Sequence, residues 1–115
     1  MKNLRKQKEF DNLRTHGKRY KQKYLDIVVA YPDENSKIEK DDFGLAVITG
    51  KIIGNAVKRN KVRRWIKEWF RQTDFSIRPA LNYLVITKKG IYKSGRKAII
   101  KELKNALEKI KHNFK

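Results

Sequence analysis

The sequence contains no cysteine, only two prolines and no long hydrophobic run, and these absences exclude several classes of protein. Without cysteine the chain can form neither a disulfide framework nor a cysteine-ligated zinc site. The longest uninterrupted apolar run covers residues 27–31, far fewer than the roughly 20 residues that a membrane-spanning helix needs. The opening MKNLRKQKEF has no apolar stretch of the kind that a signal peptide carries. Together these absences predict a cytoplasmic protein with no membrane partner.

Acidic residues are scarce as well, with 12 Asp and Glu against 30 Lys and Arg, so the formal net charge is +18 over 115 residues. Hydrophobic residues make up 39% of the chain, which favours a single packed domain over residues 1–115 rather than a disordered basic tail. A folded domain with this charge repels itself, so we expect a polyanionic partner such as nucleic acid. The alternative is that lysine-rich surfaces merely keep the protein soluble. Residues 24–46, however, carry six acidic and two basic side chains between strongly basic segments, and such clustering favours nucleic-acid binding.

Hydrophobic patterns predict an α+β (α/β) two-layer sandwich with the order α-β-β-α-β-α. Residues 24–31, 43–49 and 81–87 are rich in β-branched and aromatic side chains and are predicted to be strands. Apolar residues at helical spacing predict helices over the following ranges: 6–15, 56–72 and 96–112. Residues 32–42 are polar and rich in turn formers, so we expect an exposed hairpin connection there. The strand over residues 43–49 is almost continuously apolar, which predicts burial on both faces.

The central predicted helix carries most of the chemical information, and Asn55 can cap its first turn. At about 100° per residue, one side of it collects apolar residues that are predicted to face the core: Val62, Trp65, Ile66, Trp69 and Phe70. The opposite side collects Asn60, Arg63, Arg64, Lys67 and Arg71. Glu68 is the only acidic residue on this helix, so the opposite-charge pairs of an ordinary solvated helix are nearly absent. Because arginine suits phosphates and base edges, we interpret this side as a nucleic-acid contact face.

The segment GNAVKRNKVRRWIKEWFRQ, residues 54–72, resembles the signature helix of the bacterial ribonuclease P protein subunit. That family shows an Arg-Asn-x-x-(Lys/Arg)-Arg core, followed by an apolar and basic helical pattern that ends in an aromatic residue. Here the core runs from Arg59 to Arg64, and the aromatic residue is Phe70. The short first helix with Phe10 is also similar to the start of the family. Length, charge and order of elements agree over essentially the whole chain.

This resemblance implies both a fold and a function. The implied fold has a four-stranded sheet with a left-handed β-α-β crossover, and we expect the fourth strand near residues 18–23. The implied function is that of a subunit of the ribonuclease P endoribonuclease, a ribonucleoprotein that removes the 5′ leader of precursor tRNA to make the mature 5′ end. In that holoenzyme the RNA subunit is the catalyst and Mg²⁺ acts there, so no catalytic residue and no cofactor bound by the protein alone are expected. The implied partners are the catalytic RNA and precursor tRNA, with no obligate protein partner.

The resemblance also implies two RNA-binding sites. The residues expected to bind the catalytic RNA are Lys51, Asn55, Lys58, Arg59, Asn60, Lys61, Arg63, Arg64, Lys67 and Arg71. Among them, we expect Lys51 to take the role of a lysine that the family usually carries in a Ser/Thr-Lys-Lys segment, which this sequence lacks. The residues expected to line a cleft for the single-stranded leader are Phe10, Arg14, Lys18, Arg19, Tyr20 and Tyr24. Aromatic platforms beside cations bind single strands of any sequence, although core packing is an alternative role for Phe10 and Tyr24.

The residues show no catalytic constellation of their own. His16 and His112 lie near opposite ends of the chain, and most acids of residues 24–46 fall in the expected connection. Gly50-Lys51 is followed by Ile52, where a phosphate-binding loop would need Ser or Thr. Two alternatives stay open. Another structured-RNA-binding protein, such as a ribosomal protein, would share the charge but not the extended helix match, and a protein-only nuclease would need an acidic or histidine site.

Overall fold

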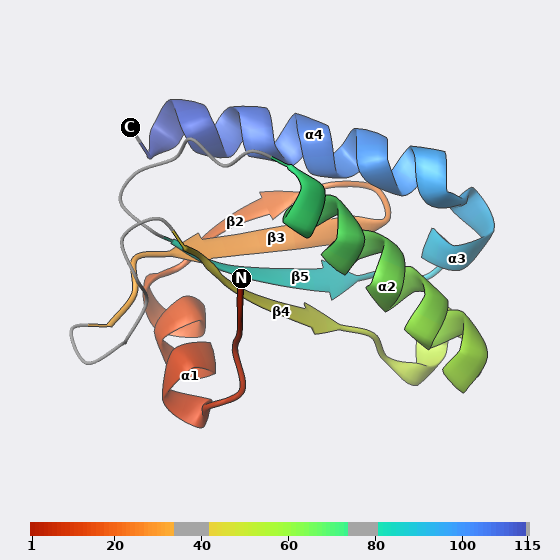
Figure 1. The fold of residues 1–115 in the computed structure, drawn as a ribbon, viewed down its shortest axis with the longest axis horizontal. Helices are drawn as coiled ribbons and strands as arrows, with labels where there is room; N and C mark the ends of the chain where they lie inside the picture. The colour runs from red at the N-terminus through yellow and green to blue at the C-terminus, as the bar shows by residue number, and fades with distance from the viewer. Residues whose placement is uncertain (34–41, 74–80, 115) are drawn as a thin grey trace.

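The computed structural model describes residues 1–33, 42–73 and 81–114, which form a mixed sheet with helices on both faces (Figure 1). The strands are β1 (Lys2–Asn3), β2 (Lys18–Lys21), β3 (Leu25–Ala30), β4 (Gly44–Ile48) and β5 (Asn82–Thr87). The helices are α1 (Gln7–His16), α2 (Ala56–Gln72), α3 (Ile91–Ser94) and α4 (Arg96–Asn113), with a 3₁₀ turn, η1 (Lys51–Ile53), before α2. The predicted α+β class is therefore confirmed, with five strands in place of four. Within the described ranges, no helix has the length and apolar character needed to cross a membrane.

The three long helices begin and end within one residue of their predicted limits. Asn55 caps α2 as expected, because its Oδ1 accepts a hydrogen bond from the backbone N–H of Lys58 at 3.0 Å. The strand expected near residues 18–23 is β2, which pairs antiparallel with β3. The sequence did not predict β1 and α3, which have two and four residues and are too short to show a periodic pattern.

The sheet has the order β1-β4-β5-β3-β2, so β5 lies at its centre. β5 pairs antiparallel with β3 and parallel with β4. The predicted hairpin between these two strands is therefore wrong, because β3 and β4 are not neighbours; residues 34–41 of that connection lie outside the described residues. In Figure 1, α2 crosses in front of the sheet and β5 lies above β4, with both strands pointing right. This β4–α2–β5 connection is left-handed, as the family resemblance implied.

The two faces of the sheet belong to different hydrophobic cores. Along β3, Leu25, Ile27 and Val29 join the larger core beneath α2, α3 and α4. The alternate residues Val28 and Ala30 join a smaller core beneath α1. Because α1 has 10 residues against 17 in α2 and 18 in α4, the α1 face of the sheet is only partly covered.

Candidate nucleic-acid interface

The basic side of α2 is exposed over most of its length. The exposed members of the predicted set are Lys51, Asn55, Lys58, Asn60, Lys61, Arg64 and Arg71. The single acid of this helix, Glu68, lies 3.9 Å from Arg64 and 3.9 Å from Arg96 of α4. The remaining cations therefore have little acidic competition for a phosphate from this helix.

Positive charge is concentrated around Lys67. Partial burial of this side chain lowers its pKa, and the nearby positive charges of Arg63, Arg71 and Arg5 lower it further. Arg5 precedes α1 and is about 60 positions away in sequence from Lys67, so the sequence pattern of α2 could not identify it. The fold thus adds a cation from the N-terminal segment to the basic side of α2, and bound phosphate would relieve the repulsion.

Two arginines of the predicted set are partly buried. Arg63 is half-buried and donates hydrogen bonds to Oγ1 of Thr49 and to Oδ1 of Asn60, the latter at 3.3 Å. Arg59 is also half-buried, and its Nε has no hydrogen-bond partner among the described residues. Both side chains are therefore positioned at the boundary between the core and the basic side.

The predicted core side of α2 faces the larger core at all five positions. Four of the five apolar residues are buried: Val62, Ile66, Trp69 and Phe70. Trp65 packs against the same core but is only half-buried, and its ring stacks on Tyr92 of α3. The reason is that α3 is short and covers only part of this edge of α2.

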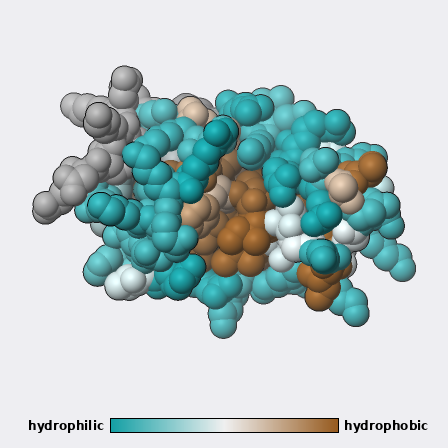
Figure 2. All heavy atoms as spheres, turned by 90° about the horizontal axis from the view of Figure 1, so that it is seen from below, coloured by the Kyte–Doolittle hydropathy of each residue, from teal (hydrophilic) through white to brown (hydrophobic). Residues whose placement is uncertain are grey.

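On the other face of the sheet, α1 and the strands form a cleft of about 380 Å³. Its lining residues are Phe10, Leu13, Arg14, Gly17, Arg19, Val28, Ile48, Leu84 and Ile86. Figure 2 shows an apolar hollow between hydrophilic walls on the underside of the molecule. The prediction that the strand over residues 43–49 is buried on both faces is wrong at Ile48, which is 44% exposed and contributes to the cleft.

Gly17 sets the distance between α1 and the sheet. A Cβ atom at this position would lie 2.2 Å from the carbonyl oxygen of Leu13 and 2.5 Å from Cγ1 of Val28. The φ angle of Gly17 is −75°, so the position requires glycine for space rather than for a left-handed backbone. The absence of a side chain lets the end of α1 lie against β3 at the base of the cleft.

A buried carboxylate fixes one wall of the cleft. Asp26 accepts a hydrogen bond from Nε of Arg19 at 2.9 Å and pairs with Nζ of Lys88 at 2.5 Å. Burial by itself raises the pKa of Asp26, but the hydrogen bonds and charges of Lys88 and Arg19 outweigh it and hold the pKa below its ordinary value. The ionised Asp26 therefore orients Arg19 beside the cleft.

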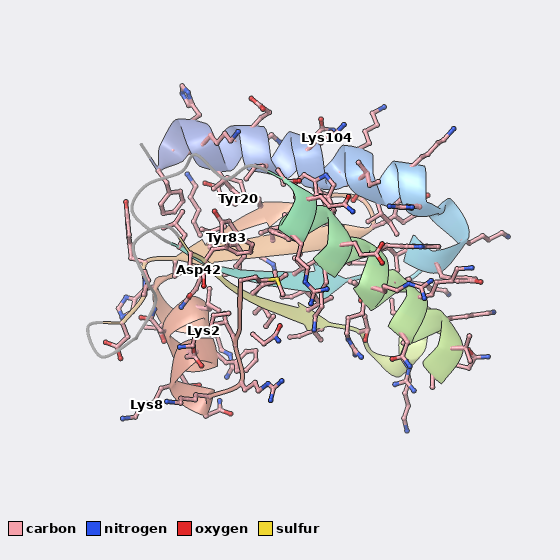
Figure 3. The ribbon with its side chains drawn as sticks, in the orientation of Figure 1. Lys2, Lys8, Tyr20, Asp42, Tyr83 and Lys104 are labelled. Atoms are coloured by element: carbon pink, nitrogen blue, oxygen red, sulfur yellow. The ribbon has the colours of Figure 1, made fainter. Side chains whose placement is uncertain are left out.

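The structure divides the six predicted cleft residues into two groups. The group that lines the cleft consists of Phe10, Arg14 and Arg19. The group outside it consists of Lys18, Tyr20 and Tyr24. Tyr20 is buried in the larger core near α4 (Figure 3), where its hydroxyl accepts a hydrogen bond from Asn113 at 2.9 Å. Alternation along β2 sends Arg19 to one face and Lys18 and Tyr20 to the other. Tyr24 lies beyond β2, where its backbone N–H donates a hydrogen bond to Glu102 of α4 at 2.9 Å.

The cleft and the basic side of α2 are adjacent. Ile48 lines the cleft at the end of β4, and the next residue, Thr49, accepts the hydrogen bond from Arg63. This hydrogen bond therefore joins α2 to the end of a strand that lines the cleft.

No group of three His, Asp or Glu side chains within residues 1–33, 42–73 and 81–114 is placed to hold a metal ion. The two surfaces, one cationic and one apolar with arginines beside it, are suited to contacts with phosphates and bases. They define an α+β nucleic-acid-binding protein.

Comparison with known proteins specifies the class further. The family model for ribonuclease P matches residues 1–111. The chain is 31% identical over 109 residues to the ribonuclease P protein component of Clostridioides difficile strain 630, which covers 94% of this chain and 90% of that protein. The RNase P protein structure from Staphylococcus aureus matches with a TM-score of 0.77 at 25% identity, over 100% of this chain and 99% of that one. The RNase P protein from Thermotoga maritima shares the fold, with a TM-score of 0.76 at 22% identity over 95% and 97% of the two chains.

The chain belongs to the ribonuclease P protein family. It is a protein subunit of the ribonuclease P endoribonuclease holoenzyme and acts in tRNA processing. The prediction drawn from residues 54–72 is confirmed at this level.

Proposed function

We propose that this chain works within ribonuclease P by holding two RNAs at once. The basic side of α2 binds the catalytic RNA, and the cleft beside α1 holds the single-stranded 5′ leader of precursor tRNA. The observation that carries the proposal is the composition of the cleft, whose apolar lining is flanked by Arg14 of α1 and Arg19 of β2.

The cleft suits a strand whose sequence varies. Any base can stack on Phe10 or rest on the apolar floor, while Arg14 and Arg19 contact the phosphates. Base-specific recognition would need polar side chains in the floor, and the described lining residues include none apart from the two arginines. The expected ligand is therefore a single strand of any sequence. It would be joined covalently to an RNA that the holoenzyme recognises elsewhere, as a leader is joined to tRNA.

The neighbouring basic side explains how leader binding aids the holoenzyme. The crowded cations around Lys67 favour a polyanion, and the Thr49–Arg63 hydrogen bond links this side to the end of the cleft. A leader in the cleft is therefore held next to RNA bound on α2, which raises the effective concentration of the substrate at the catalytic RNA.

We assign the magnesium chemistry of the holoenzyme to its RNA subunit. The described residues do not fit a protein-bound catalytic metal, because no three potential ligands gather. The role of this chain is to bind and orient RNA, so the purified protein without RNA is expected to leave precursor tRNA intact.

The test is a titration of the reconstituted holoenzyme with precursor tRNAs whose leaders grow from none to several nucleotides. Affinity should rise with leader length and then level off when the cleft is filled. Phe10→Ala should remove much of that gain, because one stacked base contributes about 1–3 kcal/mol, while binding of mature tRNA and catalytic RNA stays unchanged. Tyr31→Ala is the matched control, since Tyr31 is an aromatic residue, 51% exposed, that does not line the cleft.

An affinity that does not depend on leader length would contradict the cleft assignment. A diffuse basic surface, as in a general RNA-binding protein, would instead give an affinity that follows total RNA charge without a plateau. Cleavage by RNA-free protein would contradict the assignment of catalysis to the RNA.

A further inference from the structure

A second cluster of aromatic and basic side chains lies on the edge of α2 away from its basic side. Trp65 and Tyr92 of α3 stack with their ring planes 6° apart and their centroids 6.2 Å apart. Trp65 is about 140° around the helix from Asn60. Both rings are half-buried, so part of each packs against the larger core and part remains at the surface.

A lysine ammonium group lies over each ring. Nζ of Lys61 is 5.5 Å from the ring centroid of Trp65, and Nζ of Lys58 is 5.4 Å from that of Tyr92. Both lysines are exposed. Each contact is therefore a cation–π interaction at the surface. Such an interaction is weak enough for the lysine ammonium group to leave the ring and bind a phosphate instead.

The surroundings of this cluster are strongly positive. Residues 91–97 carry three basic and no acidic side chains. On α2 the one acid, Glu68, is shared between Arg64 and Arg96 at 3.9 Å each. The positive electrostatic potential around the stacked rings therefore favours the binding of an anion there.

Core packing alone does not account for this arrangement. The neighbouring aromatic pair on α2, Trp69 and Phe70, is buried and packs edge to face at 87°. The Trp65–Tyr92 pair instead lies parallel at the surface with cations above it. Flat aromatic rings beside lysines are what an unpaired nucleotide requires, because its base stacks and its phosphate pairs with the ammonium group.

We propose that Trp65 and Tyr92 form a stacking platform for an unpaired nucleotide of the catalytic RNA. Lys58 and Lys61 leave the rings and contact the phosphates on either side of the stacked base. This inference rests on the proposed binding of the catalytic RNA by α2. It extends the contact from one side of that helix to both, so that the RNA straddles α2.

The first test uses the wild-type protein and the catalytic RNA transcript. The chain has two tryptophans, and Trp69 is buried whereas Trp65 is half-buried, so acrylamide quenching of fluorescence reports chiefly on Trp65. Saturating catalytic RNA should reduce the quenching constant several-fold. A quenching constant that stays unchanged at saturation would overturn the platform.

The second test compares two variants of one residue. Tyr92→Leu keeps an apolar side chain but loses the ring, and it should weaken binding of the catalytic RNA about 5- to 150-fold, the contribution of one stacked base. Tyr92→Phe keeps the ring and should stay within about twofold of wild type. Equal affinity of the Leu and Phe variants would overturn the platform. Thermal unfolding verifies that each variant folds, and if the Leu variant does not, the quenching result on wild-type protein decides.

Arg63→Ala distinguishes this inference from the proposed function. If Arg63→Ala weakens binding of the catalytic RNA and Tyr92→Leu does not, the platform fails while the proposed role of α2 stands. If wild-type protein does not bind the catalytic RNA, the proposed function itself fails, and the platform fails with it.

Discussion

The two faces of the sheet are built from the same strands, but helices cover one face fully and the other only in part. On one face, α2, α3 and α4 cover β3 and β5 and bury large side chains such as Tyr83 and Phe70 completely. On the other face, α1 covers only part of the strands, and Ile48 and Ile86 remain accessible in the cleft. Both faces are apolar, so residue type alone does not distinguish a core from a binding surface. The length and position of the covering helix make the difference.

This contrast predicts that substitutions on the two faces change different quantities, the stability of the fold on one face and RNA binding on the other. Substitutions on the covered face should act on the free energy of unfolding, because they leave cavities in close-packed surroundings. Substitutions on the open face should act on leader affinity, because solvent already reaches those side chains. Asp26 lies between these extremes, since it is buried yet holds a residue of the cleft.

The largest expected effect is on the covered face. Trp69→Ala should lower the free energy of unfolding by about 3–5 kcal/mol, because it removes a buried aromatic side chain. Urea unfolding followed by circular dichroism measures the change. An unchanged unfolding midpoint would show that the two faces of α2 have been assigned the wrong way round.

An intermediate effect is expected for Asp26→Asn. At pH 7 it should cost about 1–2 kcal/mol, because charge-assisted hydrogen bonds to Arg19 and Lys88 are lost, although both partners are partly exposed to screening solvent. The pKa of Asp26 is lowered in the folded state, so its stabilising contribution is present above the unfolded pKa of about 3.9 and is lost as the pH falls through the folded pKa.

The pH dependence gives this prediction its control. The difference in unfolding free energy between wild type and Asp26→Asn should be constant near neutral pH and shrink below about pH 4. A difference that persists unchanged into strong acid would mean that the carboxylate does not stabilise the fold through its charge. Leader affinity should fall in parallel at neutral pH, since Arg19 loses its anchor.

The smallest effect on stability is expected on the open face. Ile48→Ala should change the free energy of unfolding by less than about 1 kcal/mol, because the side chain is already 44% exposed. It should nevertheless reduce the affinity gained from the leader, which the titration with graded leaders measures. A large loss of stability with no loss of leader affinity would place Ile48 in the core rather than in the binding surface.

Local patterns predicted the helices well because their information is contained within one segment. The apolar stripe of α2 and its cap at Asn55 are read from neighbouring residues, and the structure reproduces both. The basic side was predictable for the same reason. Arg5 was not, since its approach to Lys67 depends on how α1 packs against the rest of the fold.

The cleft was predictable only in part because it depends on strand pairing. β2 has the sequence KRYK, in which basic residues occupy both faces, so alternation alone cannot show that Arg19 rather than Lys18 faces the cleft. Only the pairing with β3 decides that Tyr20 enters the larger core. Ile48 was expected to be buried with the rest of its strand, and nothing local to β4 shows that α1 is too short to cover it.

The central position of β5 has a consequence for how the chain folds. Among the described strands, those that precede β5 in the sequence can form only two separate pairs, β2 with β3 and β1 with β4. Two-stranded pairs of this kind are marginally stable in water. The two pairs become one sheet when residues 82–87 insert between them. During synthesis from the N-terminus, neither hydrophobic core can therefore form completely until the last third of the chain has been made. Folding should accordingly be all-or-none and dominated by contacts distant in sequence, which slows the search for the native state.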